Sequence, residues 1–310
     1  MEIGNLLNRA YNAKTSFFAD TANPDEISYC FSSGIRHGIT TNPKIMETTG
    51  DLTLGFKGAC KKILSQYRDV PVSIETDLRG MDISQLEYKA EEVRDVLLEQ
   101  AYDILSWASN TVIKIPISRG GLLATKELAK RGAKTNVTAC MTRYQALSAA
   151  ITGATYVSLF ANRMLDARRL ELAGYDKNII NEGGEWKGIL RQLGNEGLQQ
   201  AWSDVLYKIS DTARALDGTN TSLIVGSIRS HQDILMLMSA RPQVITIPTK
   251  IVMQLEQVAL DEPTFFRMAS EMDEQYHLAI SCHSLAHPMT THTLKEFEDA
   301  AKAYRRVKTE

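Results

Sequence analysis

The segment TVIKIPIS, Thr111 to Ser118, places one lysine inside an apolar run that is typical of a buried β-strand. Val112 and Ile115 are β-branched residues, which favour the pleated backbone of a strand. A lysine removed from water is costly unless an acid pairs with it or it gives up its proton. Lys114 is therefore either a structural residue held by an acid or a neutral amine that can act as a nucleophile.

Seven further runs of this kind occur along the chain, and amphipathic helical patterns separate them. The eight predicted strands cover residues 16–20, 38–42, 71–76, 111–117, 134–139, 156–160, 222–227 and 244–248. Alternating strands and helices predict a parallel sheet with right-handed crossovers, and eight such units suit closure into a barrel. A doubly wound open sheet is the competitor, but neither GxGxxG nor GxxxxGK[ST] occurs to indicate a nucleotide site. The expected fold is an α/β protein, a (β/α)8 TIM barrel formed by residues 1–310 as a single domain.

Helix boundaries support this division of the chain. Three helices are predicted to begin and end at the following pairs of residues: Asn23 and Gly34, Ser118 and Gly132, Thr142 and Gly153. The longest predicted helix, residues 86–108, carries an apolar stripe of Leu86, Val93, Val96, Leu97, Ile104 and Leu105. Two segments exceed a simple barrel: an insertion around residues 166–215 after the sixth strand, and a helical extension around residues 262–310.

Composition excludes several classes of protein. With a net charge of -2, a pI near 6.3 and 44% hydrophobic residues, the chain is typical of a soluble globular protein without bulk attraction to nucleic acid or anionic membranes. No signal-peptide pattern and no membrane-spanning apolar run is present, so a cytoplasmic protein is expected. The four cysteines lack CxxC spacing. His283, His287 and His292 lie close in sequence, but Pro288 interrupts them and no metal site is predicted.

Nearly every predicted strand ends on a polar residue, and in a barrel these ends converge on one face. The residues are Asp20, Asn42, Glu75, Lys114, Asn136, Thr138, Arg163, Ser227 and Arg229. Any one of them alone is better explained as a helix cap or as ordinary β-propensity. Taken together they predict a polar active site, because buried polar groups need partners.

The same segments resemble a known family. FADTANPDEI, GITTNPKI, VIKIPIS with GLLATKEL, KTNVTAC, YVSLFANR, IVGSIRS and VITIP are similar, in order, to conserved segments of transaldolases from about residue 17 to 255. The C-terminal SLAHPMTTHTLKEFEDA is similar to the tail of the shorter transaldolase-like branch. The resemblance implies a class I, Schiff-base barrel enzyme that needs no cofactor and no metal.

The resemblance also implies roles for individual residues. Lys114 matches the Schiff-base lysine, and Asp20 matches the general acid/base of the carbon–carbon bond step. Glu75 and Thr138 match the pair that positions a water molecule for carbinolamine formation and breakdown. If Lys114 were only structural, Glu75 would be its partner acid.

Substrate contacts follow in the same way. The residues that match hydroxyl-binding and neighbouring positions are Asn42, Asn136, Ser158 and Phe160. Those that match a phosphate clamp are Arg163, Ser227 and Arg229, and an arginine fork with a hydroxyl can hold a phosphate monoester without a glycine-rich loop.

The expected reaction is transfer of a dihydroxyacetone unit from a ketose phosphate, such as fructose 6-phosphate or sedoheptulose 7-phosphate, to an aldose phosphate, as in the pentose phosphate pathway. A homo-oligomer is expected. The main alternative is an aldolase that releases free dihydroxyacetone, but that branch tends to carry glutamine at Glu75 and tyrosine at Phe160. The insertion and Lys44 leave open an unusual sugar phosphate. A non-catalytic sugar-phosphate-binding barrel is the alternative of another class, and loss of Lys114 or Asp20 would indicate it.

Overall fold

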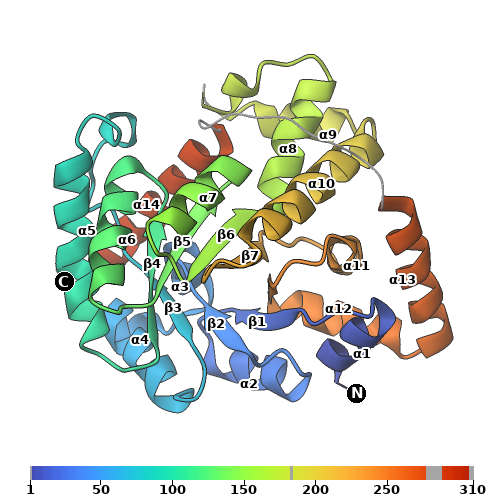
Figure 1. The fold of residues 1–310 in the computed structure, drawn as a ribbon, viewed down its shortest axis with the longest axis horizontal. Helices are drawn as coiled ribbons and strands as arrows, with labels where there is room; N and C mark the ends of the chain where they lie inside the picture. Colours follow the sequence, from blue (N-terminus) through green and yellow to red (C-terminus); the bar gives the residue numbers. More distant parts are fainter. Residues whose placement is uncertain (1, 182–183, 277–287, 307–310) are drawn as a thin grey trace.

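Within residues 2–181, 184–276 and 288–306, which the computed structural model describes, eight parallel strands close into a barrel in chain order (Figure 1). Every neighbouring pair is parallel, including the first and last strands. The strands are β1 (Ser16–Asp20), β2 (Gly38–Thr40), β3 (Val72–Glu75), β4 (Thr111–Pro116), β5 (Thr135–Cys140), β6 (Tyr156–Phe160), β7 (Ser222–Gly226) and β8 (Val244–Ile247). The predicted (β/α)8 barrel is confirmed.

Helices follow each strand and surround the barrel (Figure 1). Before β1 lies α1 (Ile3–Ala10), and the first four strands are followed by α2 (Pro24–Ser32), α3 (Pro43–Thr49) with η1 (Leu52–Leu54) and α4 (Gly55–Gln66), η2 (Ile83–Gln85) with α5 (Ala90–Leu105), and α6 (Arg119–Lys130). The last four are followed by α7 (Arg143–Ile151), α8 (Ala161–Leu172) with η3 (Lys177–Asn181), α9 (Trp186–Gln192) and α10 (Leu198–Leu216), α11 (His231–Ser239), and α12 (Thr249–Ala259) with α13 (Glu262–Tyr276) and α14 (Pro288–Arg306).

The predicted helix starts are confirmed by their side-chain hydrogen bonds. Asn23, Ser118 and Thr142 each accept a backbone N–H from the first turn of the helix that follows. One boundary differs from the prediction, because α5 begins at Ala90 and not at residue 86. The preceding residues form the 3-10 turn η2, whose start is capped by Asp82. Val93, Leu97 and Ile104 of the predicted stripe are buried in the core and Leu105 packs against it, while Val96 is only half-buried.

Additional elements follow β6 and β8. Between β6 and β7, the short η3 and α9 lie between the longer helices α8 and α10. Beyond α13, α14 packs against α3, η2, η3, α8 and the end of β5. These elements all lie at or beyond the carboxyl ends of strands, so α14 crosses the barrel face where active sites of such barrels lie.

Toward the amino-terminal ends of the strands, the barrel interior is apolar. Phe18, Ile224 and Val244 form a buried cluster there, and Tyr156 packs against it with its ring edge toward that of Phe18. Gly38 lies directly beside this cluster. A Cβ atom at Gly38 would lie 2.6 Å from the ring of Phe18, which is closer than carbon atoms approach without a shift. The polar residues of the site are therefore built above a packed apolar layer.

We expect Gly38→Ala to lower the free energy of unfolding by about 1–3 kcal/mol, because the added methyl group overpacks the barrel interior against Phe18. Gly188→Ala is the matched control, since the nearest atom to its added Cβ is the end of Arg191 at 3.9 Å. A helical Gly→Ala change without a clash should be neutral or slightly stabilising. Chemical denaturation of both variants measures the difference, and equal stabilities would contradict the packing described.

Candidate active site

Lys114 and Glu75 lie side by side inside the barrel, paired in register on the neighbouring strands β4 and β3. Each residue is only 3% exposed. Lys114 Nζ lies 3.0 Å from Glu75 Oε2 and donates a hydrogen bond of 2.9 Å to the carbonyl oxygen of Thr41. The acid that a buried lysine requires is therefore present at the same depth. The same contact gives the amine a direct acceptor for its proton.

Glu75 is an unusual carboxyl group. Burial raises the pKa of Glu75 to about 7 from its ordinary value of 4.5; the charge of Lys114 opposes the shift and that of Asp20 adds to it. A group that titrates near neutral pH is suited to gain and lose a proton during a reaction. Glu75 can therefore form an ion pair with Lys114 and can also exchange a proton with it.

Asp20 is the second carboxylate, at the end of β1. Thr40 donates a hydrogen bond of 2.6 Å to Asp20 Oδ1, and the Thr40 hydroxyl also contacts that of Thr246. Burial raises the pKa of Asp20, while the hydrogen bond from Thr40 and the charge of Lys114 act in the opposite direction. Two carboxyl groups in different environments around one amine can take different acid–base roles.

A row of small polar side chains continues around the barrel from the lysine. Asn136 pairs in register with Lys114, and its side-chain oxygen accepts a 2.8 Å hydrogen bond from Ser158. Its Nδ2 donates to Ser73 Oγ at 3.2 Å. All of these residues are buried. The predicted neighbours Asn136 and Ser158 are brought together, and Ser73 fixes the orientation of the amide.

Thr138 lies beside a distortion of its strand. The pairing of β5 with β6 shifts register between Val137 and Cys140, and Ala139 between them has a φ of +60°. Such bulges and left-handed non-glycine residues often re-aim side chains at functional sites. Thr138 Oγ1 and Glu75 Oε1 are both buried and make no hydrogen bond with the described part of the chain. Polar atoms of this kind are suited to bind a water molecule or a substrate hydroxyl.

Asn42 and Phe160, which were predicted to bind substrate, also make contacts that stabilise the fold. Asn42 caps α3, because its side-chain oxygen accepts a 2.8 Å hydrogen bond from the backbone N–H of Ile45. Phe160 ends β6 and packs with its ring centroid 6.1 Å from that of Phe297 on α14. The oxygen of Asn42 thus caps the helix with one of its two lone pairs, so both this oxygen and the amide nitrogen can contact a ligand.

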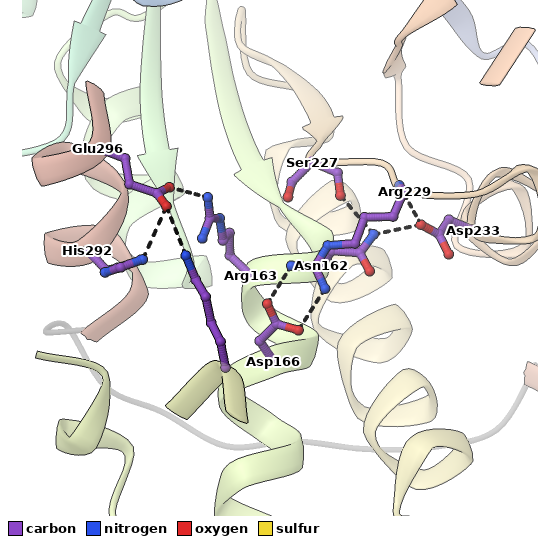
Figure 2. A network of polar contacts seen from close by, with 9 residues as sticks. Asn162, Arg163, Asp166, Ser227, Arg229, Asp233, His292 and Glu296 are labelled. Atoms are coloured by element: carbon purple, nitrogen blue, oxygen red, sulfur yellow. Dashed lines mark hydrogen bonds and ion pairs between the residues drawn. The ribbon is translucent and has the colours of Figure 1, made fainter. Parts of the chain in front are cut away.

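The three predicted clamp residues lie in one region, on α8 and on the loop after β7 (Figure 2). Ser227 has a φ of +65°, and Asn162 holds its carbonyl oxygen by a 2.8 Å hydrogen bond. Arg229 makes a two-point contact with the carboxylate of Asp166, one bond of which is 2.8 Å. Arg163 forms an ion pair with Glu296 of α14.

Several residues of this site were not predicted from the sequence. They are Thr40, Ser73, Asp166, Thr246, Glu296 and Phe297. Strand alternation could have placed Thr40 and Thr246 on the inner face of the barrel. Glu296 and Phe297 reach the site because the predicted C-terminal helix folds over the barrel face, and this long-range contact leaves no local signal in the sequence.

Among residues 2–181, 184–276 and 288–306, no three His, Cys, Asp or Glu side chains come together as metal ligands would. His283 and His287 lie outside the described residues. None of the helices in those ranges has the length and apolar character needed to cross a lipid bilayer.

A closed parallel barrel with a buried lysine and two carboxyl groups toward the carboxyl ends of its strands has the groups that an enzyme of the aldolase type uses. The family profile described as Transaldolase/Fructose-6-phosphate aldolase matches residues 17–307. The chain belongs to the transaldolase/fructose-6-phosphate aldolase family, as the resemblance of its segments predicted.

Individual relatives are of moderate similarity. A "Probable transaldolase" of Lactiplantibacillus plantarum is 31% identical over 257 residues, covering 82% of this chain and 95% of the relative. A "Probable transaldolase" of Clostridium botulinum (strain Langeland) is 30% identical over 246 residues, covering 79% and 90%. Among solved structures, the "Native KDPGal structure" matches with a TM-score of 0.39 and 11% identity, over 83% of this chain and 94% of that one.

Proposed function

We propose that this protein is a transaldolase, and that Lys114 carries the transferred unit as a Schiff base. The observation that carries the proposal is the contact of 3.0 Å between Lys114 Nζ and Glu75 Oε2 inside the barrel. Glu75 can accept the proton that the lysine must lose before it attacks a carbonyl, because its own pKa lies near 7. Asp20, which Thr40 holds in place, is the second acid–base group.

The steps balance with these residues alone. Lys114 Nζ attacks C2 of a ketose phosphate, and the carbinolamine loses water as Glu75 and Thr138 handle the protons. Asp20 then removes the proton of the C4 hydroxyl, the C3–C4 bond breaks, and its electron pair moves into the protonated imine to give an enamine. An aldose phosphate leaves, and the three-carbon unit remains on Lys114. A second aldose phosphate reverses the sequence, so ping-pong kinetics are expected.

The surroundings of the lysine favour transfer over simple cleavage. Release of free dihydroxyacetone requires a proton donor that protonates the enamine before an acceptor arrives. The apolar rings of Phe160 and Phe297 pack against each other near the lysine, and the ring of Phe297 is centred 5.8 Å from Lys114 Nζ. These rings supply no proton to the enamine, which favours its survival until an aldose arrives.

A coupled assay with fructose 6-phosphate tests the proposal. Product formation only when erythrose 4-phosphate is present supports transfer. Release of dihydroxyacetone at the same rate without the acceptor would instead identify an aldolase. No reaction under either condition would contradict this choice of donor and direct attention to other sugar phosphates.

Glu75 should make catalysis pH-dependent near neutrality. Because Glu75 must be ionised to accept the proton of Lys114 and its pKa is about 7, kcat/KM should rise with pH up to about 7 and then level off. Glu75→Gln should remove this limb and lower kcat about a hundredfold. Glu91→Gln, an exposed change on α5, is the control. An unchanged pH profile in Glu75→Gln would exclude Glu75 as the proton acceptor.

A further inference from the structure

One carboxylate in this site is surrounded by basic groups from three separate segments. Glu296 of α14 forms an ion pair with Arg163 of α8 (Figure 2). The other oxygen of Glu296 lies 3.5 Å from Lys187 Nζ of α9. His292, one turn earlier on α14, places its Nε2 3.3 Å from the same oxygen. The inserted segment and the C-terminal helix thus meet at a residue predicted to bind phosphate.

The contacts overcome the cost of placing this carboxylate in a partly buried position. The side chains of Arg163 and His292 are 19% and 18% exposed, and that of Glu296 is 32% exposed. Burial alone raises the pKa of Glu296, but its contacts with His292, Arg163 and Lys187 bring the pKa down to about 2. Glu296 therefore remains an anion throughout the physiological pH range. Arg163, Lys187 and His292 together form an anion site, and a residue of the chain itself fills it.

A buried tryptophan, Trp186, contacts both His292 and Lys187. Trp186 is 1% exposed, and its ring packs edge-on against that of His292 with centroids 5.1 Å apart. Lys187 Nζ lies 5.2 Å from the centre of the same ring. Lys187 therefore extends from a helix whose first residue is buried, and its half-exposed side chain reaches Glu296.

The helix that carries Glu296 also covers the catalytic lysine. The next residue, Phe297, is the one whose ring faces Lys114 Nζ. Glu298 then accepts backbone hydrogen bonds from Leu78 at 3.1 Å and Gly80 at 2.6 Å, in the loop after β3. Consequently the ion pair of Glu296 and Arg163 helps to hold α14 across the barrel face through which a sugar must reach Lys114.

We infer that Glu296 is an internal substitute for the substrate's phosphate, and that Lys187 and His292 are further phosphate-binding residues beside Arg163. A phosphate monoester carries more charge than a carboxylate and competes for the same three basic groups. When phosphate displaces Glu296, one restraint on α14 is lost at the moment the substrate arrives. This inference rests on the proposed function for the identity of the anion, but the anion site itself does not require any chemistry at Lys114.

Inorganic phosphate is the probe, because it binds without a reaction. Glu296→Gln removes the internal anion and should tighten phosphate binding about five- to tenfold, as measured by isothermal titration calorimetry. In the wild type, phosphate can bind only to the fraction of molecules in which Glu296 has left the site, and the apparent affinity is reduced by that fraction. Lys187→Met should weaken binding severalfold. Glu185→Gln and Lys126→Met, at exposed positions outside the cluster, are the matched controls and should change little.

Hydrogen–deuterium exchange of the wild-type protein provides a measurement that does not depend on a variant. Saturating phosphate should speed exchange in peptides from residues 288–306, because α14 loses its contact with Arg163. Unchanged exchange there, or an affinity in Glu296→Gln that is equal to or weaker than that of the wild type, would overturn the inference. The two hypotheses can fail separately. If Schiff-base trapping at Lys114 fails while Glu296→Gln still binds phosphate more tightly, the proposed function is wrong and the anion site remains supported.

Discussion

Lys114→Met should reduce turnover of fructose 6-phosphate with erythrose 4-phosphate by at least about a thousandfold. Methionine has a similar length and is apolar, so it fills the space of the buried side chain but cannot form an imine. Such a loss corresponds to about 4 kcal/mol in the activation free energy. Rates from the coupled assay at high enzyme concentration measure it.

The variant needs a control for folding, because it leaves Glu75 without its counter-ion. Glu75 has a raised pKa and can be neutral near pH 7, so we expect the barrel to tolerate the change. Circular dichroism and thermal unfolding check this, and Lys126→Met on the exposed side of α6 is the matched lysine substitution. Activity within tenfold of the wild type in a folded Lys114→Met protein is incompatible with covalent catalysis by this residue.

Asp20→Asn should lower kcat by about a hundred- to a thousandfold while leaving Schiff-base formation intact. The amide oxygen can still accept the hydrogen bond of Thr40, so the side chain should keep its position. It cannot take the proton from the C4 hydroxyl, and the cleavage step alone is affected. The distinguishing measurement is borohydride trapping with fructose 6-phosphate, which should still label the variant.

The matched control is Asp25→Asn, an exposed aspartate in the first turn of the helix after β1. It should retain nearly full activity. If Asp20→Asn turned over at the wild-type rate, or if it lost trapping as completely as Lys114→Met, then Asp20 would not be the acid–base group of the bond-cleavage step.

The barrel could be predicted from the sequence because its signals are local. A strand buried on both faces appears as a short apolar run, and a helix begins where a side chain such as Asn23 or Thr142 can accept its first N–H groups. The boundary of α5 was less accurate, because the apolar residue Leu86 continues the helical pattern into a turn that is not yet α-helical. The spacing of apolar residues indicates which face of a helix is buried, but it does not indicate where the first helical hydrogen bond forms.

The centre of the site could also be predicted, since strand ends must converge in a closed parallel barrel. The structure brings Lys114 and Glu75 together, and it places Asn136 against Ser158. The sequence could not show which acidic residue would pair with each of the two arginines. Arg229 and Arg163 were predicted to bind a phosphate, and in the structure each forms an ion pair with an acidic residue. These pairs join segments far apart in the chain, and no periodicity or spacing records such contacts.

The central claim is that Lys114 forms a covalent imine with a ketose phosphate. Its most direct test is sodium borohydride treatment in the presence of fructose 6-phosphate, followed by intact-mass and peptide mass spectrometry. We expect one added reduced sugar-derived group per chain, located on the peptide that contains Lys114 and absent from Lys114→Met. An unchanged mass of the wild-type protein, or a group attached to a different lysine, would contradict it.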